Sequence, residues 1–396
     1  MFDDLKALPE DTILGVMARF RADPFADKVD LGVGVFRDEA GHTPVLDCVR
    51  DAESRLLTTQ DTKSYVAPVG RAEFNTLVQE LVLGKSHGAL AQNRVRTIQA
   101  PGGCGALRLG AELIKAAASQ VQVHVSDPTW GNHLPLLGGA GLKLARYPYY
   151  DAAAGHLCFD AMLQALDRCN AGDVVLLHAC CHNPSGADLS PAQWNEVLAV
   201  LERRRLMPFV DLAYQGFGTG LEADAHGVRL LAEHLPEMLT AISFSKNFGL
   251  YRERVGALIL LGAKPDRTDA MTSHVLQIAR SIYSMPPDHG AAVAALILAD
   301  AQQRQRWEQE LERMRNRIQS MRRLLSATLR QKSGDGRFDF IESQCGMFSL
   351  LGLSPQQVVE LRDKHHIYMV PDSRVNIAGI TPRNAAYLAD ALLAVI

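Results

Sequence analysis

The sequence predicts an α/β protein with a mainly parallel sheet flanked by helices and, beside it, a smaller α+β domain. Short apolar runs alternate with amphipathic helical patterns, an order typical of parallel strands joined by crossover helices. The last third of the chain carries the pattern of one long helix. The chain has 396 residues, which is enough for a large core and two lobes.

The expected strands span 121–128, 173–184, 206–215, 239–246 and 255–262. A helical pattern at 191–205 lies between two of them. In parallel sheets, ligands bind outside the carboxyl ends of the strands. Asn183, Asp211 and Lys246 stand at the ends of three of these runs, so we expect a ligand site at that edge.

The long helix is indicated by one apolar stripe with steps of three and four residues. The stripe consists of Trp307, Leu311, Met314, Ile318, Met321, Leu325 and Leu329. Charged residues cover the other face, so the helix is suited to joining two lobes. The segment 337–380 then alternates short strands with one helix, which indicates the small α+β lobe.

Composition narrows the possible functions. The formal net charge of −3 gives no basic surface for nucleic acid. No window approaches the roughly 18 apolar residues of a membrane helix, and the acidic start MFDDLKALPEDTIL is neither a secretory signal nor a typical transit peptide. The seven cysteines form no CxxC pair, which predicts reduced thiols, no metal site and a cytoplasmic protein.

The stretch SFSKNFGLY (243–251) places a lysine among hydroxyl groups, with an arginine close behind. A lysine at a strand end can form an imine if its surroundings lower its pKa. Ser243, Ser245 and Arg254 offer an anion-binding set around Lys246. An imine-forming lysine beside a phosphate site suggests pyridoxal phosphate. Taken alone, this lysine also fits an ordinary exposed residue.

Other segments suit the same cofactor. In the segment 100–114, glycines at 102, 103 and 105 open into a helical pattern whose free N–H groups can bind phosphate, although such turns are also common connectors. Asp211 can stay ionised beside a protonated pyridine nitrogen, and Tyr214 and Asn183 can bond the cofactor's phenolic oxygen. A capping aspartate, a packing tyrosine and an Asn-Pro turn remain alternatives.

Together, the motifs SFSKNFGLYRERVG, DLAYQGF, CCHNPSGADLS, SDPTWGNH, GGCGALR and SRVNIAG resemble those of the fold-type I, class I aminotransferases, in the aspartate and aromatic amino acid branch. The resemblance runs from LGVGVFRDEAGHTPVL to the C-terminus. It implies a pyridoxal-phosphate enzyme with a seven-stranded sheet. It also implies ping-pong transfer of the amino group of aspartate, tyrosine or phenylalanine to 2-oxoglutarate.

The resemblance implies a role for each matching residue. Lys246 would carry the cofactor and move the proton, with Asp211, Tyr214 and Trp130 as the other catalytic residues. The implied cofactor-binding residues are Lys246, Gly103, Cys104, Asn183, Asp211, Tyr214, Ser243, Ser245, Arg254, Tyr65, Trp130 and His133. The implied substrate-binding residues are Gly34, Trp130, Asn183, Arg280, Arg374 and Phe348.

The two arginines would set the substrate class. Arg374 would hold the α-carboxylate, and Arg280 the distal carboxylate of a dicarboxylic substrate. The resemblance places Tyr65 and Arg280 in the neighbouring subunit's site, which implies a homodimer with shared sites. It also implies an N-terminal arm (1–14) that contacts the partner, a small domain (15–47 and 312–396) and a large cofactor-binding domain (48–311).

Some residues depart from the family pattern. Cys104 stands where the family usually has Thr or Ser at the phosphate, and a thiol is a weaker donor. Ser64 and Met285 replace asparagines that are usual in the aspartate-preferring enzymes. The residues that look like the aspartate-preferring branch are Val35, Arg37 and Thr43, whereas SDPTW, GADLS and YQGFGTG look closer to the aromatic branch. The second substrate therefore stays open.

Three other classes fit parts of the pattern. Decarboxylases and β-lyases use the same fold and lysine, but the paired arginines favour transfer. A ligand sensor would add a DNA-binding domain, for which the chain shows neither a spare N-terminal helix-turn-helix nor a basic patch. A cofactor-free scaffold would leave the polar residues without a use.

Overall fold

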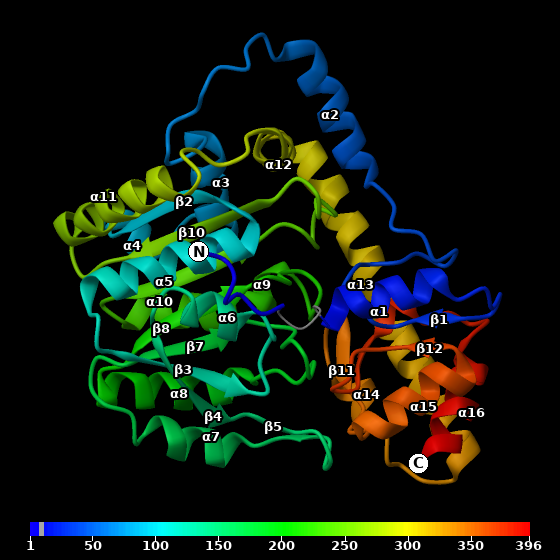
Figure 1. Ribbon diagram of the computed structural model, residues 1–396. Coiled ribbons are helices and arrows are strands. Elements are labelled where there is room, and N and C mark those ends of the chain that lie inside the picture. The colour runs from blue at the N-terminus through cyan, green and yellow to red at the C-terminus, as the bar shows by residue number, and fades with distance from the viewer. Residues whose placement is uncertain (8–11) are drawn as a thin grey trace.

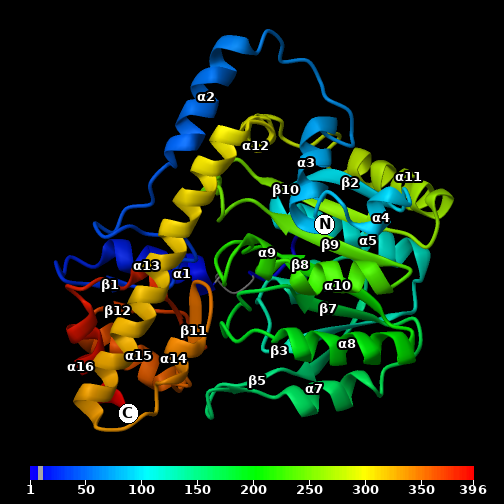
Figure 2. The same ribbon diagram turned by 180° about the vertical axis from the view of Figure 1, so that it is seen from behind.

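The computed structural model describes residues 1–7 and 12–396. A seven-stranded sheet carries helices on both faces, and a smaller group of helices and short strands lies beside it (Figures 1 and 2). The strand order is β2-β10-β9-β8-β7-β3-β4. β10 runs antiparallel to both of its neighbours, and the other pairs are parallel. The predicted α/β fold with a mainly parallel seven-stranded sheet is confirmed.

The strands of the large sheet are β2 (Val95–Pro101), β3 (Gln122–Asp127), β4 (Lys143–Pro148), β7 (Val174–His178), β8 (Met207–Leu212), β9 (Met238–Ser243) and β10 (Val255–Leu261). The shorter strands are β1 (Val29–Asp30), β5 (Tyr150–Asp151), β6 (His156–Leu157), β11 (Phe348–Leu350), β12 (Ile367–Tyr368) and β13 (Arg374–Asn376). The strand predicted over 173–184 is longer than the observed strand β7. β7 ends at His178 because the chain then turns, and Asp188 accepts the N–H groups of Cys181 and His182.

The helices are α1 (Thr12–Ala22), α2 (Asp47–Thr59), α3 (Ala72–Leu83), α4 (Gly88–Ala91), α5 (Gly102–Ala117), α6 (His133–Gly138), α7 (Phe159–Leu166), α8 (Pro191–Arg204), α9 (Leu221–Asp224), α10 (His226–His234), α11 (Pro265–Ile282), α12 (His289–Ala299), α13 (Ala301–Ser333), α14 (Phe340–Ser343), α15 (Pro355–His365), α16 (Ala385–Val395) and the 3-10 turn η1 (Ile377–Gly379). None of them is long and apolar enough to cross a membrane, as far as the described residues show.

The large sheet is buried on both faces, which explains its nearly continuous apolar strands. Along β7, Val174 and Leu176 join the core beneath α5 and α11. Val175 and Leu177 join the larger core on the other face, which includes α8, α12 and α13. Successive side chains of a strand point to opposite faces, so the four apolar residues of β7 contribute alternately to the two cores.

The long helix α13 connects the large sheet to the smaller group of elements (Figures 1 and 2). It has 33 residues, and its predicted apolar stripe is buried. The domain boundaries at 47/48 and 311/312 stay a prediction, and α13 runs without a break across the second. The predicted arm (1–14) includes residues 8–11, which lie outside the described residues.

We expect Trp307→Phe to lower the free energy of unfolding by about 1–3 kcal/mol, because a buried carbonyl would lose its donor. The Trp307 ring stacks on Phe248 with centroids 4.4 Å apart, and its Nε1 donates to the Asn247 carbonyl at 2.8 Å. This contact fastens α13 to the loop that carries Lys246. Urea denaturation measures the change.

Trp194→Phe is the matched control. Trp194 is also buried, and its Nε1 donates no hydrogen bond within the part of the chain that the structure describes. An equal loss of stability in the two variants would contradict the role given to the Trp307 hydrogen bond.

Candidate active site

The polar residues predicted from the sequence gather at the carboxyl edge of the large sheet. His178 at the end of β7 pairs in register with Asp211 on β8, and Asp211 pairs with Ala241 on β9. Lys246 follows β9 by three residues. Side chains from this edge line a cavity of about 260 Å³. The predicted residues that line it are Gly34, Gly103, Cys104, Trp130, Asn183, Asp211, Tyr214, Ser243, Ser245, Lys246, Arg254, Phe348 and Arg374.

Asp211 is a buried carboxylate held in its ionised form. Burial by itself raises its pKa, but the hydrogen bond from His133 and the nearby positive charges bring the pKa below its ordinary value. His133 Nε2 lies 3.0 Å from Asp211 Oδ2. Behind it, Thr129 Oγ1 lies 2.8 Å from His133 Nδ1 and 3.4 Å from His178 Nε2. The carboxylate therefore ends a buried chain of hydrogen bonds and faces the cavity.

Lys246 presents its amine to the same cavity. Nζ lies 4.8 Å from the centroid of the Tyr214 ring and makes no hydrogen bond among the described residues. Burial lowers the pKa of Lys246, while electrostatic interactions with Asp211 and Cys104 oppose that shift. A lysine with a lowered pKa has a larger neutral fraction, and the neutral amine is both a nucleophile and a base.

An anion-binding cradle forms where α5 begins. Arg254 Nη1 lies 3.4 Å from Ser245 Oγ. A Cβ at Gly102 would lie 2.6 Å from Arg254 Nη2, and a Cβ at Gly103 would lie 3.0 Å from Ser243 Cβ. The two glycines therefore let the positive end of the helix approach the hydroxyl groups and the guanidinium. Such a combination binds phosphate or another anion.

Arg374 is a buried cation at the opposite side of the cavity. It is 5% exposed, and burial lowers its pKa. Nη1 donates to Asn183 Oδ1 at 3.1 Å and Nη2 donates to the Gly32 carbonyl at 2.9 Å, whereas the buried Nε has no partner among the described residues. The guanidinium lies over the Phe348 ring at 4.3 Å. A carboxylate in the cavity would neutralise the charge of the guanidinium.

Gly34 fits this wall because it lacks a side chain. A Cβ at Gly34 would lie 2.8 Å from Phe348 Cζ. The phenyl ring is held in turn by an edge contact with Tyr214, whose centroid lies 6.1 Å away. The backbone of residue 34 can therefore approach the ring that supports Arg374.

Three predicted site residues do not line this cavity. His133 lies behind Asp211, where its Nε2 is 3.0 Å from Asp211 Oδ2. Tyr65 is 92% exposed. Arg280 is exposed at the end of α11, where it donates to Ser284 Oγ. Within one chain, Tyr65 and Arg280 do not join the site, so their roles in a partner's site stay predictions.

Some residues of the cavity were not predicted. His178, Cys180 and Tyr251 also line it. Burial lowers the pKa of His178 to about 3, so the imidazole is neutral. The Tyr251 hydroxyl accepts the Phe36 N–H at 2.9 Å, which joins the glycine-rich segment around Gly34 to the lysine loop. The position of His178 at the end of a parallel strand, with Cys180 just after it, was the signal that could have identified them.

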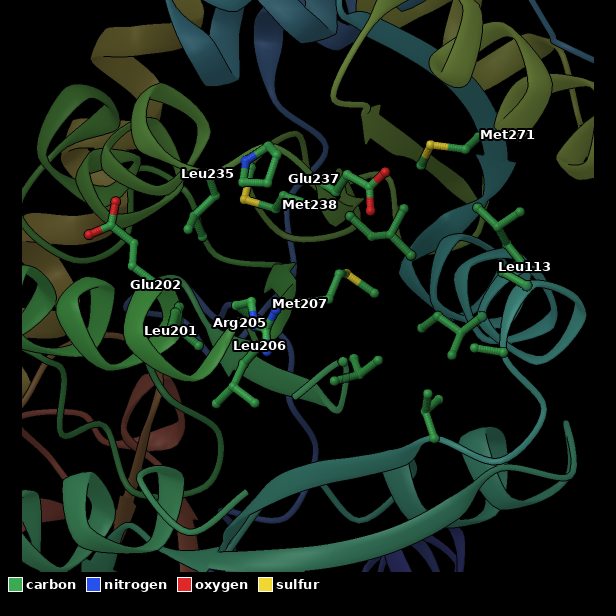
Figure 3. Close-up of a pocket in the computed structure, with 18 of the residues that line it drawn as sticks. Leu113, Leu201, Glu202, Arg205, Leu206, Met207, Leu235, Glu237, Met238 and Met271 are labelled. Carbon is green, nitrogen blue, oxygen red and sulfur yellow. The ribbon is translucent and has the colours of Figure 1, made fainter. Parts of the chain in front are cut away.

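A larger cavity lies at the other end of the sheet. It has a volume of about 580 Å³, and its apolar walls include Leu113, Met207, Met238 and Met271 (Figure 3). It lies at the amino ends of β7, β8 and β9. It contains no nucleophile paired with a base and no anion cradle. We therefore place the candidate active site in the smaller cavity, where charged and nucleophilic groups converge.

One group of possible metal ligands is present among the described residues. The ligand atoms of Cys180, Cys181 and Asp224 lie within 4.8 Å of one another. Asp224 already accepts the N–H groups of Gly216 and Gly218 at 2.7 and 2.9 Å, and burial raises the pKa of the Cys181 thiol. These contacts account for the cluster as part of the packing of the turn.

Residues 26–392 match the family model of the class I and II aminotransferases. The chain belongs to this family. It is 46% identical over 396 residues to the aspartate aminotransferase of Escherichia coli strain K12, with 100% of both chains covered. It is 48% identical over 391 residues to the aromatic-amino-acid aminotransferase of Pseudomonas aeruginosa, covering 99% of this chain and 98% of the relative.

Solved structures agree with this assignment. The aromatic-amino-acid aminotransferase from Burkholderia pseudomallei, covalently bound to pyridoxal phosphate, superposes with a TM-score of 0.97 at 43% identity, covering 100% of this chain and 99% of the other. The predictions of the family, the fold type, an aminotransferase and its pyridoxal phosphate cofactor are confirmed. The roles of individual residues stay predictions.

We expect Lys246→Met to raise the melting temperature of the cofactor-free aminotransferase by about 1–2 °C. The pKa of Lys246 is lowered in the folded chain, so protonation favours the unfolded chain. This destabilisation is fully present below the folded pKa and disappears above the ordinary value of 10.5. The gain from the substitution should therefore be seen at pH 7 and vanish above about pH 11.

Lys264→Met is the control, because Lys264 is exposed and its side chain has no partner in the described structure. Thermal unfolding followed by circular dichroism measures both variants. Similar changes in both variants, or a gain that persists at high pH, would show that desolvation of Lys246 is not the cause.

Proposed function

We propose that this aminotransferase moves the amino group of aspartate and of aromatic amino acids to 2-oxoglutarate, with pyridoxal phosphate held by Lys246. The observation that supports this most is the convergence of four groups on one cavity: the amine of Lys246, the ionised Asp211, the anion cradle of α5 and the buried guanidinium of Arg374.

The residues of the cavity fit the cofactor part by part. The cradle of Ser243, Ser245 and Arg254 suits a phosphate. The carboxylate of Asp211 suits a protonated pyridine nitrogen. Trp130 offers an indole ring beside His133, with centroids 5.2 Å apart. When bound, pyridoxal phosphate supplies an aldehyde and an electron-withdrawing ring that weakens the Cα–H bond of the amino acid.

The chain's own residues would then position the substrate and move its proton. Arg374 would bind the α-carboxylate with its guanidinium and so orient the amino acid. Lys246 would take the Cα proton as a general base, since burial lowers its pKa toward the working pH. Asp211 would keep the ring nitrogen protonated. Asn183 is already bonded to Arg374 and would align the carboxylate site with the ring.

We also propose that the active unit is a homodimer in the cytoplasm. Tyr65 and Arg280 are exposed and lie outside the cavity of their own chain, and Phe2, Leu5, Leu57 and Ile282 are large apolar side chains on the surface. A second copy would cover such residues. The seven cysteines are unpaired, which suits a reducing compartment.

A half-reaction tests the proposed substrates. The pyridoxal-phosphate form is mixed separately with aspartate, glutamate, tyrosine and phenylalanine, without any 2-oxo acid, and the 2-oxo acid released per site is measured. We expect one equivalent from dicarboxylic and aromatic substrates alike. Release from aspartate and glutamate only would restrict the enzyme to dicarboxylates. Release of CO2, or of pyruvate from substrates other than alanine, would favour a decarboxylase or lyase.

Arg280→Leu should reduce kcat/KM for aspartate by about 100-fold or more, because the distal carboxylate would lose a charged partner. The value for phenylalanine should change by less than about threefold, since its ring needs no cation. Arg267→Leu is the control, because Arg267 is another exposed arginine on α11. Equal losses for both substrates would contradict the assignment of Arg280.

Mixing two inactive variants tests the shared site. Lys246→Ala and Arg280→Leu each abolish or strongly reduce turnover of aspartate. After the subunits are exchanged, a mixed dimer holds one site with both residues intact if Arg280 reaches across the interface. Random mixing should then restore about a quarter of the normal activity. No recovery, despite mixed dimers seen by native mass spectrometry, would place Arg280 in its own subunit's site.

A further inference from the structure

The anion cradle contains a thiol. Cys104 is the third residue of α5, is partly exposed, and lines the cavity together with Ser243, Ser245 and Arg254. Its Sγ accepts a hydrogen bond from Asn132 Nδ2 at 3.6 Å. A hydroxyl in this position could only bond an anion, whereas a thiol can also form a covalent bond to sulfur.

The other cysteines are less suited to such a reaction. Cys48, Cys169, Cys180 and Cys181 are buried, and burial raises the pKa of Cys345 to about 11. Buried thiols of this kind are inert. Cys158 is partly exposed, but it lies near Asp127 and Asp151 in a separate surface depression. Cys180 lines the same cavity as Cys104, but Cys104 differs from it because it is partly exposed and lies in the anion cradle at the start of α5.

Positive charge surrounds the approach to Cys104. The guanidinium of Arg254 and the amine of Lys246 line the same cavity, and the N-terminus of α5 adds its partial charge. Lys246 and Cys104 line the same cavity, and their electrostatic interaction opposes the effect of burial on the pKa of Lys246. The field of these groups draws in anions of small size. Tyr214 is 6% exposed and lines the same cavity. Its hydroxyl has no hydrogen-bond partner in the described structure and can therefore bond a ligand in the cavity.

We propose that Cys104 is a covalent modification site at which small anionic disulfides or thiosulfonates compete with the phosphate of the cofactor. This inference rests on the proposed position of pyridoxal phosphate. The acidic group of the reagent would occupy the cradle of Ser245 and Arg254 and hold its sulfur near Cys104.

The reaction is a thiol–disulfide exchange. The Cys104 thiol gives its proton to solvent, and the thiolate attacks one sulfur of the reagent. A Sγ–S bond forms while the S–S bond of the reagent breaks, and the other half leaves as a thiolate, or as a sulfinate when the reagent is a thiosulfonate. The acidic tail then fills the place that the phosphate requires. Dithiothreitol reverses the change.

Two methanethiosulfonates that differ in charge test the site. One carries a 2-sulfonatoethyl group and the other a 2-(trimethylammonium)ethyl group. The full-length aminotransferase, freed of cofactor, is treated with each, and peptide mass spectrometry follows every cysteine. We expect the anionic reagent to modify Cys104 at least about tenfold faster than the cationic one. Saturating pyridoxal phosphate or inorganic phosphate should suppress the reaction.

The modified protein is then titrated with pyridoxal phosphate, and binding is followed by the absorbance of the cofactor. We expect affinity to fall at least about tenfold after the anionic modification and to return after dithiothreitol. For Cys104→Ser, treatment with the reagent should not change the affinity for the cofactor relative to the same variant before treatment, and Cys158→Ser should lose affinity on treatment as the unchanged chain does. Equal rates with the two reagents, or unaltered cofactor binding after modification of Cys104, would overturn the proposal.

The two proposals fail in different ways. If the unmodified chain does not bind pyridoxal phosphate in this cavity, the proposed function fails, yet charge preference and protection by inorganic phosphate would still reveal an anion site at Cys104. If the cofactor binds normally and Cys104 reacts without charge preference or protection, the modification site fails alone.

Discussion

The burial of Lys246 beside an ionised Asp211 is the constraint on which the rest of the site depends. A buried charge is costly unless it is paired and hydrogen-bonded. For Asp211, the hydrogen bond with His133 offsets that cost. Thr129 in turn contacts both His133 and His178 through its hydroxyl. Lys246 receives no such hydrogen bond from the residues that the structure describes, and its pKa is lowered. The sheet thus holds a stable anion and a reactive amine side by side.

The two ends of the cavity come from different parts of the fold. The anion cradle belongs to α5 and to the turns after β9, within the large sheet. Arg374 on β13 and Phe348 on β11 belong to the smaller group of elements. Asn183 is the bridge, because its side chain follows β7 and accepts a hydrogen bond from Arg374. Any movement of the smaller group would therefore change the distance between the carboxylate site and Lys246.

The relatives of this chain are named after two different classes of substrate. The chain is 46% identical to an aspartate aminotransferase and 48% identical to an aromatic-amino-acid aminotransferase. In the proposed function, the groups that line the cavity would serve the cofactor and the α-carboxylate, which both substrate classes share. The side chain that would distinguish a carboxylate from an aromatic ring is Arg280, which lies outside the cavity of its own chain. In the proposed homodimer, substrate choice would therefore depend on the assembly.

The sequence by itself determined the sheet, the long helix and the identity of most cavity residues. Apolar periodicity is a local signal, and polar residues after parallel strands meet at one edge. Asn183, Asp211 and Lys246 followed from that rule alone, whereas Arg374 and Gly34 needed the family resemblance.

Only the tertiary structure decided which polar groups touch. The series of hydrogen bonds from His178 through Thr129 and His133 to Asp211 joins three separate segments. The hydrogen bond between Tyr251 and Phe36 joins two residues that lie far apart in the sequence, with most strands of the large sheet between them. The end of β7 at His178 was also undecided in the sequence, because the apolar run continues into Ala179 and Cys180. Such contacts depend on side-chain directions and on the packing of distant segments, which no local pattern contains.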